Sequence, residues 1–157
     1  MLIRSLEQRD WPAVKAIFED GIASGKATFD REAPSWEDWD GAHLPLRLVA
    51  EDDGGIVGWA ALSPYSHREC YRGVAESRVY VAERARGHGV GRALMERLID
   101  DAEAQGYYSI HAGVFPWNEE SLKLHERVGF RVVGVHERLG LLDGEWKDVV
   151  VLERRSA

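Results

Sequence analysis

A run of three alternating glycines lies between an apolar, β-rich segment (residues 74–81) and a helical pattern that begins at its end. The N-terminus of a helix leaves backbone N–H groups without partners and carries the positive end of the helix dipole, so it favours an anion such as a phosphate. Glycines let such a ligand approach the backbone closely. The run is Arg86-Gly87-His88-Gly89-Val90-Gly91, with Arg84 and Arg92 as further flanking charges. The spacing alone leaves two interpretations open, a phosphate-binding loop and a plain strand-to-helix turn.

Two common phosphate motifs fit this run poorly. A dinucleotide-binding fold needs G-x-G-x-x-G and an acidic residue at the end of a second strand. Here the spacing is G-x-G-x-G, and Asp100 and Asp101 fall inside the predicted helix. A nucleotide-hydrolase loop needs G-K-[ST], which does not follow these glycines.

Two titratable residues stand on either side of the glycine run. Glu76 begins a strand whose other residues are mostly apolar, which favours partial burial of its side chain. A carboxylate has too low a pKa to deprotonate an ammonium group unless a dry pocket or a water relay assists it. His125 lies in a later helical pattern, and an imidazole can donate or relay a proton near neutral pH. The alternatives are a surface glutamate on a strand edge and a half-buried helix histidine with a satisfied hydrogen bond.

The patterning predicts one domain, residues 1–157, with elements in the order β-α-α-β-β-β-α-β-α-β-β. Asp10, Ser35 and Asn118 are predicted helix N-caps, and Asp52–Gly55 and Asp143-Gly144 are predicted hairpin turns. Predicted strands cover residues 2–5, 74–81 and 107–115, with hairpins at 46–62 and 130–155; predicted helices follow Asp10, Ser35, the glycines (to Gly106) and Asn118. This order gives an α/β (α+β) fold with one mixed sheet.

Composition excludes several classes of function. A net charge of −7 argues against nucleic acid or an anionic membrane as the main partner. The single cysteine, Cys70, allows no intrachain disulfide, and no apolar run approaches about 18 residues, which indicates a cytoplasmic protein. The remaining histidines lack metal-ligand spacing with one another or with Cys70, so no metal site is predicted. They are His43, His67, His111 and His136.

The glycine run matches the [QR]-x-x-G-x-[GA] loop of the GNAT superfamily of N-acetyltransferases, which cradles the pyrophosphate of acetyl-CoA. Three further stretches resemble its phosphinothricin/methionine sulfoximine acetyltransferase branch: "YRGVAESRVYV", "NEESLKLHERVGF" and "GEWKDV". The predicted order of elements agrees with that superfamily over most of the chain. The resemblance implies a GNAT fold, with a mixed, mostly antiparallel sheet, about four helices and strands splayed at the acetyl-CoA site, and it implies a homodimer.

The resemblance also implies roles for individual residues. Glu76 corresponds to the base, and His125 stands where much of the superfamily has a tyrosine that protonates the thiolate. Arg72 corresponds to the arginine that holds the acceptor's carboxylate. Arg68, four residues earlier in the same loop, is a second candidate for this contact. Tyr71 and Phe29 are candidates for the wall of the acceptor pocket. The expected acetyl-CoA contacts are Val79, Tyr80, Val81, Arg86, Gly87, His88, Gly89, Val90, Gly91, Arg92, Asn118 and Ser121, of which the first three act through their backbone.

The function implied is transfer of an acetyl group from acetyl-CoA to the α-amino group of a small amino-acid-like acceptor, such as phosphinothricin or methionine sulfoximine or sulfone. Direct attack in a ternary complex is expected, because lone Cys70 gives no support for a covalent intermediate. Trp146 and Asp148, in the last motif, are expected to be structural or to lie at the dimer interface. Two alternatives stay open: acetylation of a protein N-terminus, and a non-catalytic CoA-binding sensor.

Overall fold

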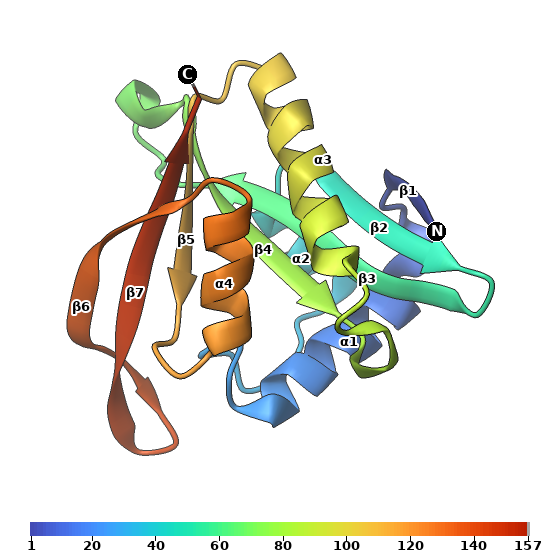
Figure 1. Cartoon of the computed structure of the whole chain (residues 1–157), viewed down its shortest axis with the longest axis horizontal. Coiled ribbons are helices and arrows are strands. Elements are labelled where there is room, and N and C mark those ends of the chain that lie inside the picture. The colour runs from blue at the N-terminus through green and yellow to red at the C-terminus, as the bar shows by residue number, and fades with distance from the viewer. Residues whose placement is uncertain (157) are drawn as a thin grey trace.

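The computed structural model describes residues 1–156 and contains seven strands and four α-helices in the predicted order (Figure 1). The strands are β1 (Leu2–Ser5), β2 (Arg47–Asp52), β3 (Gly55–Pro64), β4 (Val74–Val81), β5 (Ser109–Val114), β6 (Arg131–Leu142) and β7 (Glu145–Arg155). The helices are α1 (Trp11–Ser24), α2 (Trp36–Ala42), α3 (Val90–Ala104) and α4 (Glu119–Arg127).

All strands belong to one sheet, in the order β1-β2-β3-β4-β5-β7-β6. Every neighbouring pair is antiparallel except β4 and β5, which run parallel. These two strands pair only from Val74↔Ser109 to Glu76↔His111 and then diverge, as the two arrows do in Figure 1. The predicted mixed, mostly antiparallel sheet with splayed strands is therefore confirmed, and we call the point of divergence the fork.

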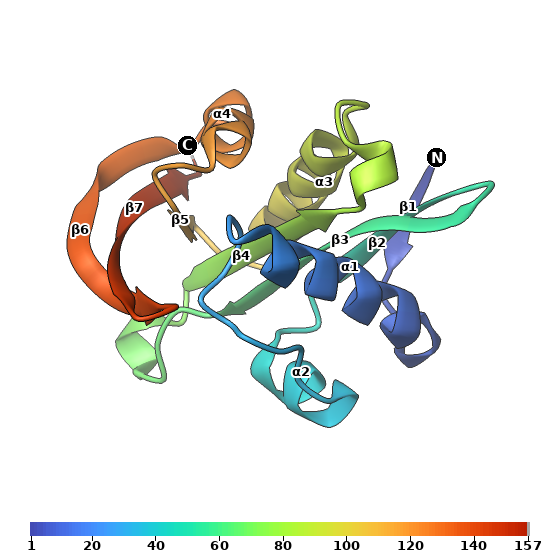
Figure 2. The ribbon, with the colours of Figure 1, turned by 90° about the horizontal axis from the view of Figure 1, so that it is seen from below.

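The helices cover the two faces of the sheet in pairs, with α1 and α2 on one side and α3 and α4 on the other (Figure 2). All four residues of the predicted apolar stripe of α3 are buried: Val90, Leu94, Leu98 and Ala102. On the opposite face, Phe18 of α1 and Trp39 of α2 pack around Trp59 of β3 and Tyr80 of β4. The hydrophobic cores on both faces therefore fix β3 and β4, which lead to the fork.

Two of the three predicted helix caps are confirmed. The Ser35 and Asn118 side chains accept hydrogen bonds from backbone N–H groups in the first turns of α2 and α4. Asp10 occupies the predicted N-cap position of α1, but its carboxylate makes no cap hydrogen bond to the helix. It instead binds the Arg4 guanidinium through two 2.8 Å bonds and the backbone N–H of Glu7. These charge-assisted bonds occupy the carboxylate, and they hold the pKa of Asp10 below its usual range.

His43 makes the stability of this fold pH-dependent. Its ring stacks on Trp39, Nδ1 donates to the Trp39 carbonyl at 2.7 Å, and burial lowers its pKa from 6.5 to about 4. Between these values the unfolded chain binds a proton that the folded chain does not, so stability falls as the pH drops, by up to about 3 kcal/mol. We expect denaturant midpoints measured from pH 7 to 4.5 to fall more steeply for wild type than for His43→Gln. Equal slopes for the two proteins would contradict this account.

Candidate functional site

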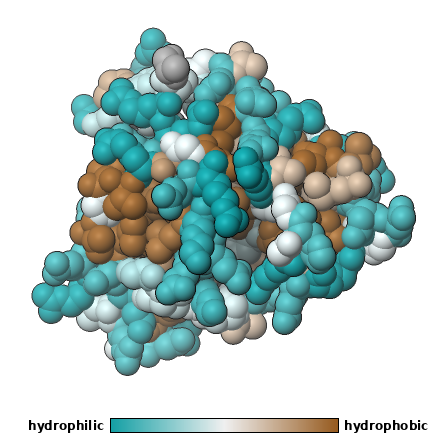
Figure 3. Space-filling model, in the orientation of Figure 1, coloured by the Kyte–Doolittle hydropathy of each residue, from teal (hydrophilic) through white to brown (hydrophobic). Residues whose placement is uncertain are grey.

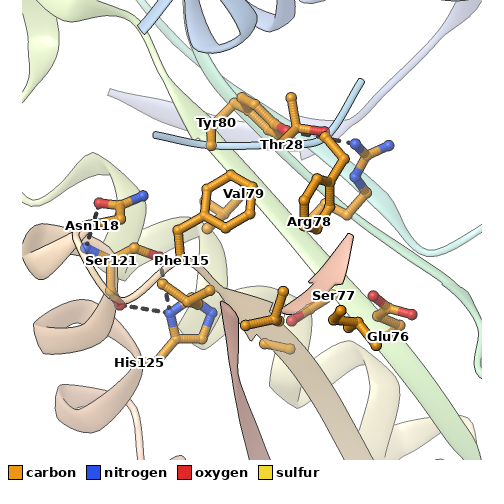
Figure 4. Close-up of a pocket in the computed structure, with 17 residues that line it drawn as sticks. Thr28, Glu76, Ser77, Arg78, Val79, Tyr80, Phe115, Asn118, Ser121 and His125 are labelled. Carbon is orange, nitrogen blue, oxygen red and sulfur yellow. Dashed lines mark hydrogen bonds between the residues drawn. The ribbon is translucent and has the colours of Figure 1, made fainter. Parts of the chain in front are cut away.

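A cavity of about 320 Å³ opens at the fork (Figure 4). It lies between β4, the divergent end of β5, helix α4 and the loop that follows α1. Predicted site residues that line it are Phe29, Glu76, Val79, Tyr80, Asn118, Ser121 and His125. Further lining residues that the sequence analysis did not single out are Ala27, Thr28, Ser77, Arg78, Ala112, Gly113, Val114, Phe115, Leu139 and Val149. The fork thus brings together both predicted catalytic side chains.

Glu76 is the last residue of β4 that pairs with β5. Side chains two apart on a strand share a face, so Glu76 lies on the side of Tyr80, which packs against α1. The predicted partial burial was wrong, because Glu76 is exposed. The sheet opens immediately after this residue, and the apolar neighbours in its sequence face the cores while its own side chain faces the cavity.

His125 is buried on α4, with 4% of its surface exposed. Its Nδ1 lies 2.7 Å from the backbone oxygen of Ser121. Because a carbonyl oxygen can only accept, Nδ1 carries the hydrogen in the neutral ring and Nε2 keeps its lone pair. Burial lowers the pKa of His125, which favours this neutral form. At neutral pH, Nε2 is therefore an acceptor for a proton and not a donor.

Asn118 and its neighbour hold a loop beside the cavity, which we call the strap (residues 25–30). The Asn118 side chain caps α4 and also donates to the Lys26 carbonyl at 3.0 Å, and the Trp117 indole donates to the Gly25 carbonyl at 3.1 Å. Phe29 packs edge-on against Phe115 at 4.8 Å between centroids. The strap therefore forms one wall of the cavity.

Gly140 of β6 gives the strap room at its other side. A Cβ added at Gly140 would lie 2.5 Å from the Phe29 ring. A side chain at this position would displace the ring, so the placement of Phe29 at the cavity depends on this glycine.

Two of the alternating glycines have the conformation that only glycine adopts readily. Gly87 and Gly89 have φ of 78° and 81°, and no atom lies within 4 Å of a Cβ added at either. Gly89 is the N-cap of α3, so the first N–H groups of the helix face an open loop. His88 between them is exposed. The backbone is thus free to receive an anion.

Gly91 differs from the other two. Its φ is not positive, and an added Cβ would lie 3.2 Å from Leu124 of α4 and 3.4 Å from Val81. The expectation that all three glycines clear space for a ligand is therefore corrected, because Gly91 lets α3 approach α4 and β4. Val90 beside it is buried in the core.

The charges around the loop are exposed. Arg86 donates from Nε to the Val81 carbonyl at 3.4 Å, and Arg92 pairs with Glu96 one turn along α3 at 2.8 Å. Both side chains can turn toward an anion at the loop without breaking a buried contact. They would supply attraction, while the backbone N–H groups define the position.

The predicted acceptor residues outside the strap do not line the cavity. The Arg72 side chain is 76% exposed and pairs with Glu69 at 3.4 Å, and Tyr71 is 38% exposed and packs on Tyr65. Arg68 lies over the Tyr71 ring. Arg78 is the arginine that lines the cavity. Period-two alternation from Glu76 is the sequence signal that could have identified it.

Asp148 and Trp146 of the C-terminal motif GEWKDV lie in different environments. Asp148 accepts a hydrogen bond from the Arg138 backbone N–H at 2.8 Å, and Arg138 has a positive φ of 48° within an irregular part of β6. Asp148 therefore shapes this strand, as expected for a structural residue. Trp146 is 60% exposed.

No cluster of three or more metal-ligating side chains occurs within residues 1–156, and no helix there is long and apolar enough to span a membrane.

Residues 3–130 match the acetyltransferase (GNAT) family, so the chain belongs to that family. It is an acetyl-CoA-dependent N-acetyltransferase by class, as the sequence predicted. The chain is 35% identical over 160 residues to phosphinothricin N-acetyltransferase of Alcaligenes faecalis, with 97% of this chain and 81% of that protein covered. It is 30% identical to the L-methionine sulfoximine/L-methionine sulfone acetyltransferase of Pseudomonas aeruginosa, with 96% and 92% covered. The crystal structure of a phosphinothricin acetyltransferase from Sinorhizobium meliloti in complex with acetyl-CoA superposes with a TM-score of 0.89 at 26% identity, covering 98% and 87%.

Proposed function

We propose that this enzyme transfers the acetyl group of acetyl-CoA to the α-amino group of a small amino-acid acceptor of the phosphinothricin or methionine sulfoximine/sulfone type. The observation that carries the proposal is the cavity at the fork, which places Glu76 and His125 in one small space. The activities for which these two relatives are named support this acceptor class.

Acetyl-CoA fits the groups around the fork. The N–H groups at the start of α3 and the loop from Arg86 to Gly91 suit its pyrophosphate. Beyond Glu76, the side of β4 that faces β5 has no strand partner, so backbone groups of Val79–Val81 are available for the amides of the pantetheine arm. Asn118 and Ser121 line the opposite side of this gap. Together these groups orient the thioester toward the cavity.

The acceptor nitrogen must lose its ammonium proton before it attacks the thioester carbon. Because Glu76 is exposed and no dry pocket surrounds it, we expect the proton to reach its carboxylate through water. The N–C bond then forms, with backbone N–H groups of β4 stabilising the oxyanion. The C–S bond breaks as the nitrogen loses its second proton, and CoA leaves as a thiolate that takes its proton from water. Neutral His125 has an accepting Nε2, so we assign it to relaying a proton away from the amine and not to protonating the thiolate.

Direct attack in a ternary complex is also supported. Cys70, the single cysteine of the chain, lies in a short 3₁₀ turn (Glu69–Tyr71), is exposed and does not line the cavity. It therefore offers no nucleophile for a covalent acetyl-enzyme. A free exposed thiol and a metabolic cosubstrate suit a reducing compartment, and we propose a cytoplasmic location, which cell fractionation tests.

A thiol-release assay with acetyl-CoA tests the proposed function. We expect turnover with L-methionine sulfone, L-methionine sulfoximine or phosphinothricin, and none with a peptide that carries an N-terminal alanine, because the strap walls the cavity at Phe29. Turnover of the peptide alone would identify a protein N-terminal acetyltransferase. Tight binding of CoA without turnover of any amine would identify a sensor.

We also propose that the enzyme is a homodimer that associates through β6. This strand is at the end of the sheet with only β7 beside it, and its apolar side chains form a brown area at the left of Figure 3. Exposed apolar residues in this region are Val132, Val133, Val135, Leu139, Leu141 and Trp146. Unpaired edge strands and contiguous exposed apolar patches are features of association surfaces.

Replacing Val135 by aspartate tests the dimer. The side chain is 53% exposed on β6, so the substitution disturbs the core of one chain little but places a charge in the apolar patch. We expect light scattering to give twice the chain mass for wild type and the chain mass for Val135→Asp. The control is Leu2→Asp, since Leu2 is 56% exposed on β1 at the other edge of the same sheet. A monomeric wild type, or equal effects of both variants, would contradict the proposal.

A further inference from the structure

Arg78 is a largely covered arginine on the wall of the cavity. It follows Glu76 by two residues in β4, so both side chains leave the same face of the strand. Its side chain is 26% exposed, against 76% for Arg72. Figure 4 shows Arg78 on the Glu76 side of the cavity, next to Thr28 and Tyr80. A cation in this place can pair with an anionic group of a ligand in the cavity.

The guanidinium group of Arg78 is held in a defined plane. It lies over the Phe18 ring at 5.0 Å and 5.8 Å from the centroid of Tyr80. Nη2 donates to Asp30 Oδ2 at 3.1 Å and lies 3.5 Å from the Tyr80 hydroxyl. Aromatic stacking and these contacts fix the group before a ligand arrives, which lowers the entropy lost on binding.

The contacts of Arg78 leave two of its three guanidinium nitrogens without a hydrogen bond. Both side-chain hydrogen bonds involve Nη2, and neither Nε nor Nη1 has a hydrogen-bond partner among residues 1–156. Nε–H and the N–H groups of Nη1 point to different sides of the guanidinium, so each can donate a separate hydrogen bond. A negatively charged oxygen is the acceptor that such charged donors bind most strongly, and a carboxylate offers one.

The charges around the cavity match a zwitterion. Glu76 and Asp30 are anionic groups on the same face as Arg78, and neutral His125 lies on the other side of the cavity. Residues two apart on a strand are separated by about 6.6 Å. An α-amino acid carries its ammonium and carboxylate on one carbon, so it can direct the former toward Glu76 while the latter meets Arg78.

We infer that Arg78 binds the α-carboxylate of the acceptor and is the specificity-determining residue that selects amino acids over amines without this charge. The inference rests on the proposed function, in which the acceptor is a small amino acid. It replaces Arg72 in the role that the sequence resemblance implied. The strap contributes through Asp30, which orients the guanidinium from its Nη2 side.

The test compares L-methionine sulfone with its α-carboxamide, which keeps the amine and side chain but lacks the negative charge. We expect Arg78→Gln to lower kcat/KM for the acid by about 30- to 100-fold, the effect of a lost charge-assisted pair. The value for the carboxamide stays within about 3-fold of wild type. The wild-type preference for the acid therefore collapses. Arg78→Lys keeps the charge without the planar guanidinium and retains part of the preference for the acid.

Three further variants make the result specific. Arg97→Gln is the matched control, because Arg97 is an exposed arginine that pairs with Asp101 at the same 3.1 Å. We expect this variant to prefer the acid over the carboxamide as strongly as wild type does. Asp30→Asn keeps a side-chain oxygen that accepts from Nη2, so the guanidinium stays in place and most of the preference remains. If Asp30→Asn abolishes it as fully as Arg78→Gln, or if Arg78→Gln lowers both substrates equally, Arg78 is an anchor of the strap and the inference is wrong.

The Arg72→Gln variant tests whether Arg72, and not Arg78, binds the carboxylate of the acceptor. Loss of the preference in Arg72→Gln with none in Arg78→Gln would overturn the inference while leaving the proposed function intact. A wild-type enzyme that turns over neither compound would instead refute the proposed acceptor class, and the inference with it. Circular dichroism melting of each variant shows whether a lost activity reflects a lost fold.

Discussion

Glu76→Gln is expected to lower kcat/KM for an amino-acid acceptor by about 10²- to 10³-fold, the range typical of a lost general base. The amide cannot accept the ammonium proton, directly or through water. The Kd for acetyl-CoA should not change, because the groups that suit the cosubstrate are backbone atoms of β4 and the glycine loop. Stopped-flow or steady-state thiol release, with calorimetry for the Kd, measures both quantities.

The control for this variant is Glu19→Gln on α1. Glu19 is exposed, as Glu76 is, and it does not line the cavity. Its substitution should leave both kcat/KM and the melting temperature unchanged. A Glu76→Gln enzyme as active as the wild type would remove the base from the mechanism, although the family and the fold would stand.

Gly89→Glu is expected to raise the Kd for acetyl-CoA by about 100-fold. The substitution puts a side chain at a φ of 81° and adds a negative charge at the N-terminus of α3, where the pyrophosphate is proposed to bind. Charge repulsion and the blocked approach to the backbone both oppose binding. Isothermal titration calorimetry measures the change.

Gly144→Glu is a closely matched control. Gly144 has a φ of 80°, no atom lies within 4 Å of its added Cβ, and it belongs to the turn between β6 and β7. Both variants carry the same backbone strain and the same added charge. If the two raise the Kd equally, the effect of Gly89→Glu comes from general destabilisation, and the loop loses its assignment.

The order of the elements could be predicted because each element is locally consistent. The stripe of α3, the caps Ser35 and Asn118 and the turn at Asp143-Gly144 are all patterns within a few residues. Asp10 shows where such reasoning stops. Its partner Arg4 lies in β1, and the ion pair that the fold creates takes the carboxylate away from the first turn of α1.

The sequence was sufficient to predict the motifs of the candidate site, but not which of their side chains face the cavity. Glu76 stands among apolar residues in the sequence, but the fork that exposes it depends on where β5 leaves β4. In the sequence, Gly91 is indistinguishable in kind from Gly87 and Gly89. In the structure, however, it lies against Leu124 of α4. Arg72 and Arg78 belong to the same motif, and the fold places Arg78 at the cavity and Arg72 outside it.

A crystal structure with bound CoA tests the central claim most directly. We predict that the pyrophosphate contacts backbone N–H groups between Arg86 and Arg92, and that the sulfur lies in the fork within reach of the cavity that holds Glu76 and His125. A nucleotide bound elsewhere on the chain, or a sulfur on the far side of β4 from that cavity, would contradict the account.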